Sequence, residues 1–577
     1  MKKITVVFVI MGLLVISGYV YVRTSLTTPG FEPPPGQGAA AQTKSPETVL
    51  DLKPKLVQKL QQLVKEGSNG LYNLYVRELK PDIVNSTVSI SDASLVPDTA
   101  AMKKLESSGQ LPDEVFKIEA DAITIDGLGI NDLFSGDVVN VKAIHIRRPT
   151  INVYSRSTSG NRKQEKETLY HRLMNQMKHI GIGKLVLDDG TLITHKAGSD
   201  KSTRFNDIAV KLSDIVIDST TQFDKKRFLF ARDAQITLKN YVVPSSNDLY
   251  TFKVSVVSIN ATKQLLVARG ISLQPHYSKQ EFQQHTETQK ERYDISIPSI
   301  VIRNTNWWDL INNQVLQASS ADLGSVKASV YLDRRKPLAP TEMRQFPQQM
   351  LMKIPMKLRI QKVTVGDLDL VYEEFSKVSK QAGKLYVSNL HGTISNLTNL
   401  PNAIKSNHIT TVSASGMFMK TAPVTLGLSF DLTKYQSGAF SAQIESKTTV
   451  DGPTINPIAE PLGLFRVKTG ELKQLISHVS GDNRQASGNV TMLYDNLHIT
   501  PMKADPGNPG ELKKKSVTSL IANTFVLKDE NPSKDGDVRK EDASFTRKSG
   551  TFFNLIWKTT LVGILKTIGA PTKLAEE

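Results

Sequence analysis

Long stretches of the chain alternate apolar and polar residues with a period of two, which predicts β-strands with one buried face. The run from Ile118 to Ile125 departs from this rule in its middle, because two residues rather than one separate Ala120 from Ile123. Successive side chains of a strand point to opposite faces. The slip therefore moves the apolar set to the other face unless an extra residue is inserted.

The slip recurs as one spacing: two apolar positions one residue apart, two spacer residues, and two more apolar positions one residue apart. About six chance matches are expected at this hydrophobic content. The matches carry weight because most of their apolar positions are Ile, Val or Leu, and because they fall where helix signals are absent. Eight runs fit the spacing: residues 118–125, 139–146, 180–187, 210–217, 252–259, 295–302, 358–365 and 492–499.

Two interpretations fit the slips. A β-bulge inserts one residue, restores the same face and bends the strand, so that one side of a long sheet stays apolar while the sheet curves. Alternatively, each slip is the end of one short strand and the start of the next, as in a β-sandwich. The spacing by itself is compatible with both.

Helical periodicity is confined to three segments. Apolar residues fall on one face in residues 54–67 and again in residues 167–180. The third segment, residues 551–571, is apolar nearly all round, with Thr551 as a cap and Pro571 after its end. Three helices are too few to cover the sheet. We therefore expect a mainly β fold in which the sheet closes as a sandwich or curls into a groove, and the lack of a clear linker between residues 80 and 500 favours one elongated structure.

The N-terminus carries a candidate membrane anchor. An uncharged apolar run at residues 4–22 follows two lysines, and its nineteen residues match the thickness of a bilayer core. We expect a cytoplasmic tip at residues 1–3, a transmembrane anchor at residues 4–22, a Pro/Gly-rich linker at residues 23–46 and the remaining chain outside the cytoplasm. A cleaved signal peptide, with Ala39 and Ala41 at the cleavage site, is the alternative.

Charge and cysteine content narrow the function. The chain has no cysteine, which excludes disulfides, thiol catalysis and Cys-ligated metals. Its net charge is +16, with many lysines in the loop stretches at residues 503–516 and 539–550. No nucleic-acid-binding signature accompanies this charge, so we expect no nucleic-acid partner. The charge either favours anionic membrane surfaces or keeps the chain soluble.

No catalytic or metal motif stands out. His171 and His179 lack a metal-ligand spacing, and we expect ordinary surface or core histidines. The group from Asp482 to Arg484 is expected to form a turn between strands rather than a sugar or phosphate site. The pair Trp307 and Trp308 is expected to pack in the core or at an interface. We therefore predict no enzyme, no cofactor and no metal.

The apolar C-terminal segment has two interpretations. It is too short to span a bilayer and contains Lys558 and Lys566. It either caps or plugs the groove, or lies in a membrane interface or on a partner protein. The residues predicted for membrane or partner contact are Phe552, Phe553, Ile556, Trp557, Leu561 and Ile564.

These stretches together resemble the AsmA-like family of bacterial envelope proteins, whose largest members are TamB and YhdP. The resemblance rests on "FKIEADAITIDGLGI", "IGIGKLVLDDGTLIT", "LRIQKVTVGDLDLVYEE" and "GELKQLISHVSGDNRQASGNVTMLYDNLHIT", together with the N-terminal anchor. It implies an elongated, curved antiparallel β-groove in the periplasm, similar to the bridge-like lipid transfer proteins, held by an inner-membrane anchor. It also implies a role in phospholipid transport to, or homeostasis of, the outer membrane.

We accordingly expect AsmA-like β-regions at residues 47–335 and 336–510, and a basic loop with an apolar helix at residues 511–577. The expected partners are phospholipids, the inner membrane and an outer-membrane or periplasmic protein. An apolar groove would shield acyl chains from water, at about 0.8 kcal/mol per methylene. The alternatives are an assembly factor for outer-membrane proteins with a closed β core, and a hydrolase with an unseen site. The residues expected to bind lipid are Ile118, Ile123, Ile125, Val139, Val141, Ile144, Ile146, Ile182, Leu185, Leu187, Ile215, Ile217, Ile300, Ile302, Val363 and Val365.

Overall fold

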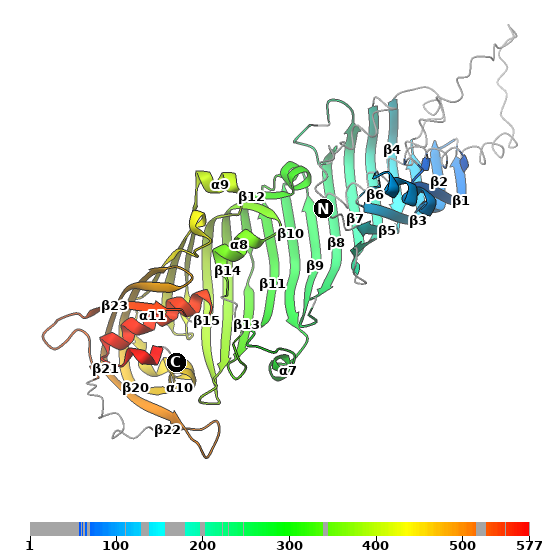
Figure 1. The fold of residues 1–577 in the computed structure, drawn as a ribbon. Helices are drawn as coiled ribbons and strands as arrows, with labels where there is room; N and C mark the ends of the chain where they lie inside the picture. Colours follow the sequence, from blue (N-terminus) through cyan, green and yellow to red (C-terminus); the bar gives the residue numbers. More distant parts are fainter. Residues whose placement is uncertain are drawn as a thin grey trace, which may run out of the picture. The chain divides into compact units, whose positions relative to one another are not determined.

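The computed structural model describes the chain from residue 57 to residue 575 with gaps (Figure 1). The predicted anchor and linker, and residues 167–178 of the second predicted helix, lie outside the described residues. Two compact units are present: unit 1 contains residues up to 242, 254–267 and 306–314, and unit 2 the rest. The gaps within the described range are residues 59–60, 62–63, 66–67, 69, 83, 110, 113, 128–137, 156–178, 197–201, 222, 229, 246, 339–343, 515–526 and 548–549.

The fold is mainly β, with 23 strands in a large mixed sheet and few helices. This confirms the expected fold class at the coarse level and corrects the expectation of a purely antiparallel sheet. Val- and Ile-rich alternation accounts for the strands, because branched side chains pack well on a pleated, half-buried surface.

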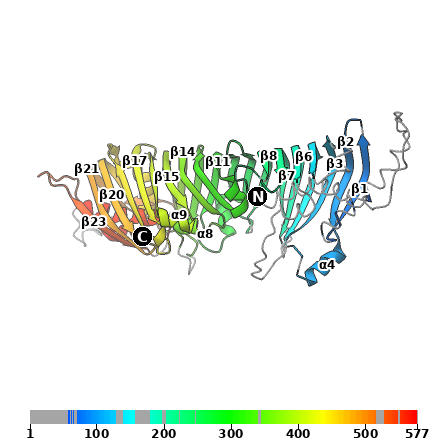
Figure 2. The same ribbon diagram turned by 90° about the horizontal axis from the view of Figure 1, so that it is seen from above.

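Unit 1 contains the first eight described strands, and a helix of nine residues lies beside the first of them (Figure 2). Asp98 caps this helix by accepting hydrogen bonds from the backbone N–H groups of Ala100 and Ala101. The elements are β1 (Tyr72–Asp82), β2 (Thr87–Pro97), α4 (Thr99–Ser107), β3 (Glu114–Asp126), β4 (Val138–Arg147), β5 (Thr150–Ser155), β6 (His179–Lys196), β7 (Ser202–Ile217) and β8 (Ala231–Pro244). The strands β9 (Tyr250–Asn260) and β10 (Leu265–Pro275) are each divided between the two units: residues 254–260 and 265–267 belong to unit 1, and the remaining residues of both strands belong to unit 2.

A split strand interrupts the antiparallel order of unit 1. β3 pairs antiparallel with β4 along one half and with β5 along the other, and β6 then pairs in parallel with both. The break between β4 and β5 contains Arg148, whose φ is +45°. Parallel neighbours need a connection that returns to the starting end of the sheet, so local alternation could not reveal this pairing.

Unit 2 repeats this arrangement. β11 pairs antiparallel with β12 and β13, and β14 pairs in parallel with both before antiparallel pairing resumes. Its strands are β11 (Arg292–Arg303), β12 (Val315–Leu323), β13 (Val326–Asp333), β14 (Lys357–Phe375), β15 (Ala382–Thr398), β16 (Ile409–Phe418), β17 (Ala422–Asp431), β18 (Phe440–Ser446), β19 (Val450–Asp451), β20 (Phe465–Gly481), β21 (Gln485–Ala504), β22 (Leu512–Lys514) and β23 (Lys540–Thr546).

The helices agree only partly with expectation. The C-terminal helix is confirmed as α11 (Phe552–Thr567), capped by Thr551, and the described residues between 57 and 65 are helical. Sequence periodicity missed α4 and four further helices, since elements of six to nine residues show too few turns for a clear pattern. The four are α7 (Lys279–Gln284), α8 (Pro347–Lys353), α9 (Pro401–Ser406) and α10 (Asn456–Gly463).

All eight slips lie inside single strands, so they are not boundaries between short strands. In β6, for example, Ile182 and Leu185 are both buried although three positions separate them. Two of the eight slips have a residue with positive φ between their halves, Asp214 in β7 and Asn496 in β21. The non-glycine residues of the described strands that adopt positive φ are Asp92, Asp189, Asp207, Asp214, Asn240, Asn389, Asn396 and Asn496.

Candidate functional site

The apolar residues of unit 1 form continuous rows across neighbouring strands. In registered pairs the side chains lie on the same face, so each pair extends a row by one strand. One row crosses seven strands: Leu79, Ile90, Ile123, Ile146, Leu187, Val210 and Ile236. The next row contains Val88, Ile125, Ile144, Leu185, Leu212 and Ala234.

The structure brings together all twelve unit 1 residues that were expected to bind lipid. Six belong to the two rows above. Val141, Ile182 and Ile215 form a third row. Val139 pairs with Ile180, which pairs in turn with Ile217, although the side chain of Val139 is not among those described. The last row contains Leu95, Ile118, Ile151 and Leu192.

This face of unit 1 is closely packed. Ile144 is 0% exposed and Ile146 is 1% exposed, and the other described members of the predicted set are also buried. A carboxylate placed there would lose its hydration without a partner, at a cost of several kcal/mol. Replacing Ile144 and Ile146 by Asp would therefore unfold unit 1, and cannot serve as a selective test of lipid contact.

Unit 2 carries longer rows. Ile302 and Val363 belong to one row that crosses ten strands, and Ile300 and Val365 belong to its neighbour. The first row continues beyond Val363 through Ile394, Val412, Leu428, Ala442, Val479, Gly488 and Ala543. The second continues beyond Val365 through Gly392, Ala414, Leu426, Ile444, Ser477 and Val490.

The opposite face of the same strands is polar. A row of small hydroxyl side chains, with one lysine, is adjacent in sequence to the first apolar row, on the side away from the second, and points the other way. It consists of Ser320, Lys362, Ser395, Thr411, Ser429, Ser441, Ser480, Ser487 and Ser544. The sheet of unit 2 is thus amphipathic, which is the pattern of a sheet with one face in water.

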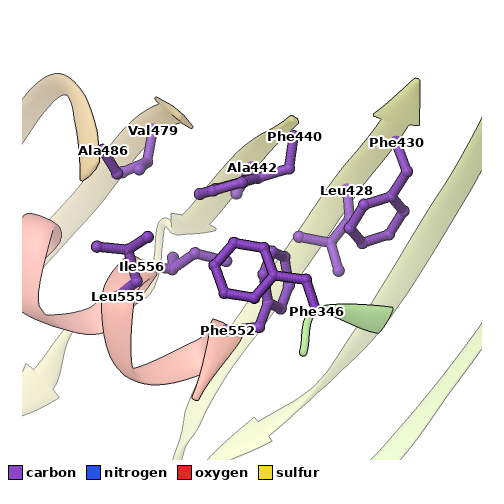
Figure 3. Close-up of a cluster of buried hydrophobic side chains, with 10 residues drawn as sticks. All are labelled: Phe346, Leu428, Phe430, Phe440, Ala442, Val479, Ala486, Phe552, Leu555 and Ile556. Carbon is purple, nitrogen blue, oxygen red and sulfur yellow. The ribbon is translucent and has the colours of Figure 1, made fainter. Parts of the chain in front are cut away.

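Helix α11 covers one end of the apolar face. It contacts β20, β21 and β23, and Phe552 packs against Phe346, Phe430 and Phe440 (Figure 3). The Thr560 hydroxyl lies 2.8 Å from that of Ser477 in the second row. This packing places Phe552 and Ile556 in the core of the chain itself. Of the predicted contact residues, Phe553 and Trp557 remain exposed, and Leu561 and Ile564 are half-buried.

The middle of the apolar face is less covered. Ile300, Val365, Ile394 and Val412 are half-buried, whereas Val479 and Val490, near α11, are buried. Branched aliphatic side chains that keep partial contact with solvent across β11 to β16 form an apolar strip. We refer to these four residues as the open strip. Val412, at one end of the strip, also packs against the core cluster around Phe552, so the strip borders the covered part of the face.

A polar cluster lies near the far end of β14. Arg334 donates two hydrogen bonds to Glu374, at 2.6 and 3.2 Å, and the Tyr372 hydroxyl donates a third at 2.5 Å. Burial, reinforced by the Glu374 carboxylate, raises the pKa of Tyr372 well above its ordinary value. Arg344 pairs with Glu291 in the same region. Since each of these charges has a partner, the cluster stabilises the fold and offers no unsatisfied group to a ligand.

The other candidate residues occupy structural positions. Trp307 is buried in unit 1, where its Nε1 donates to the carbonyl of Ala261. Asp482 accepts hydrogen bonds from the backbone of Arg484 and Gln485 in the turn between β20 and β21, as expected. His179 Nδ1 lies 3.2 Å from an Asp218 oxygen, and His171 is outside the described residues.

The slip spacing missed part of the face. β16, β17 and β18 contribute Val412, Leu428 and Ile444 to the rows, yet these strands follow plain alternation with polar residues, mostly Ser and Thr. A search for simple period-two alternation would have found them.

The comparisons with known proteins do not identify the chain: no protein-family model matches it, and neither does any curated protein. The resemblance to the AsmA-like family therefore remains an expectation. Among the described residues, no helix has the length and apolar character needed to cross a membrane, and no group of three His, Asp or Glu side chains could hold a metal ion.

Proposed function

We propose that the chain is a lipid-binding protein of the bacterial envelope, anchored in the inner membrane, which holds phospholipid acyl chains along its apolar sheet face and assists their transport to the outer membrane. The observation that carries this proposal is the pair of apolar rows in unit 2, with the open strip in their middle and a Ser/Thr face behind them. An acyl chain lying on such a strip loses contact with water at every position.

No catalytic residue is needed for this activity. The half-buried side chains of the open strip come from β11, β14, β15 and β16. The half-buried Leu323 of β12 pairs with both Ile300 and Val365, so the apolar contact continues from strand to strand. A chain that moves by one strand exchanges one set of aliphatic contacts for another, which keeps the free-energy barrier low. The charged headgroup can stay in solvent.

The test is a photochemical crosslink in living cells. A photoreactive p-benzoyl-phenylalanine replaces Val412 in the full chain, in cells grown with radioactive phosphate, and the protein is run on a denaturing gel after irradiation. We expect a radioactive phospholipid adduct. The matched control is Ser413, the next residue of β16, which is exposed and faces the opposite side. Equal labelling at Val412 and Ser413, or none at Val412, Ile394 and Val365, would sink the proposal.

A second candidate is an assembly factor with a closed β core. The near-complete burial of the rows in unit 1 favours it for that unit, because a closed face presents nothing to an acyl chain. The crosslinking experiment separates the two functions, since an assembly factor would give protein adducts and no lipid adduct.

A further inference from the structure

A short apolar segment is exposed where α8 leads into β14. Met350 is 53% exposed, Ile354 41% and Met356 43%. Among the described residues, these are the only three exposed large hydrophobic side chains that fall within seven consecutive positions. Other residues of the same helix, Gln348 and Leu351, are buried against the protein. The helix therefore has a second apolar side that the described chain does not cover.

The segment is held in one conformation. The Asn399 side-chain amide donates to the carbonyls of Leu351, Ile354 and Met356, at 3.4, 3.5 and 3.1 Å. The same residue accepts a hydrogen bond from the backbone N–H of Leu358. These bonds order the turn between α8 and β14, so that its apolar side chains are presented without a further ordering cost when they bind.

Three exposed lysines lie on this segment or on the helix that follows Asn399. Lys353 and Lys357 flank Ile354 and Met356 in sequence, and Lys405 belongs to α9, which begins two residues after Asn399. In Figure 2 the two helices lie on the same side of the strands. None of the three lysines forms an ion pair with another described residue. We call Met350, Ile354, Met356 and these lysines the α8 patch.

We propose that the α8 patch docks unit 2 onto the surface of an anionic bilayer, with the three apolar side chains inserted among the headgroups and the three lysines against the lipid phosphates. Exposed apolar residues accompanied by lysines are typical of interfacial membrane contacts. A stable protein interface takes some 20–30 residues on each side, far more than the six residues of the α8 patch. The proposal deepens the proposed function, on which it rests for its purpose, because it names the membrane contact through which lipid would be delivered.

The chain has no cysteine, so a single Met350→Cys variant of the full-length protein can carry one environment-sensitive fluorophore. The protein is held in nanodiscs and mixed with vesicles of phosphatidylcholine containing 30% phosphatidylglycerol. We expect a blue shift and quenching by brominated lipid in the added vesicles. Changing Lys353, Lys357 and Lys405 to Gln should weaken the response about fivefold per lysine. Ser413→Cys, on the polar face, is the matched control.

Three outcomes would overturn the proposal: no response at Met350, an equal response at Ser413, or the same response to monomeric dihexanoyl-phosphatidylglycerol, which would indicate binding of a single lipid molecule. The proposal and the proposed function fail separately. A lipid adduct at Val412 without a fluorescence change at position 350 would reject the docking surface alone. A fluorescence change at position 350 without a lipid adduct at Val412 would reject acyl-chain binding alone.

Discussion

Aspartate or asparagine at positive φ occupies the bend in two of the slips. Asp214 lies between Leu212 and Ile215 in β7, and Asn496 between Tyr494 and Leu497 in β21, each with φ near +50°. Most residues pay about 1–2 kcal/mol for this conformation, because the Cβ approaches the following carbonyl oxygen. Asn and Asp adopt it more readily. Their presence inside apolar strands is therefore a backbone requirement and not a sign of a polar site.

We predict that Asn496→Val destabilises unit 2 by about 1–2 kcal/mol, because a β-branched residue is strained at positive φ. Asn496→Gly should have little effect. The measurement is the midpoint of urea unfolding. Asn489→Val is the matched control, since Asn489 is exposed on the same strand with an ordinary backbone conformation. If both valine variants lose the same stability, the positive φ is not the cause.

At the scale of the elements, α11 fixes how far the apolar face is closed. The helix approaches the sheet closely at Gly563, where an added Cβ would lie 2.4 Å from a Val490 methyl carbon. Val562 and Leu565, the neighbours of Gly563 on the helix, pack in the same core cluster as Val490. Because an open apolar face would otherwise continue to β23, the helix sets the boundary between closed core and open strip.

Gly563→Ala should destabilise the protein by about 1–3 kcal/mol through this clash. The sign of this stability change distinguishes the two cases, since Gly→Ala in an unobstructed helix stabilises by about 1 kcal/mol. Thermal and urea unfolding of the variant measure the change in the free energy of unfolding. A stabilised variant would mean that α11 is not packed tightly against Val490. Phe553→Ala, on the exposed side of the helix, serves as a control for helix integrity.

For the whole molecule, the two units share one arrangement: a split strand followed by a parallel partner and antiparallel pairs. In unit 1 it involves β4, β5 and β6, and in unit 2 β12, β13 and β14. The two units differ in how far their apolar rows are covered. The rows of unit 1 are buried, whereas those of unit 2 remain half-buried in their middle. Unit 2 is thus the better place to look for bound lipid.

The predicted location of the chain can be tested by labelling a single introduced cysteine, because the natural sequence contains none. If residues 4–22 anchor the protein with its bulk in the periplasm, an Asn489→Cys variant should react with a membrane-impermeant maleimide in cells whose outer membrane alone is permeabilised. We expect nearly complete labelling before lysis. Labelling that requires disruption of the inner membrane would contradict this topology, and a cytoplasmic cysteine protein provides the control.

The sequence predicted which residues lie on the buried faces of the strands better than it predicted which strands pair with each other. Alternation and slips located the buried residues of β3, β6, β7 and β14, because these signals are local. It missed the parallel pairing of β14 with β12 and β13, which depends on which distant strands meet. It also missed the α8 patch, since the turn that carries Ile354 and Met356 is ordered by Asn399, which is more than forty residues away in the sequence.

The register of the rows also has a consequence for how such a chain can change in length. Each of the strands β15 to β18 adds one residue to each row and keeps hydroxyl side chains on the other side. A duplicated hairpin inserted there would widen the apolar face by two strands and leave the polarity of both faces of the sheet unchanged. The architecture is therefore extensible in the way of repeat proteins, in which size can grow without redesign of what is already folded.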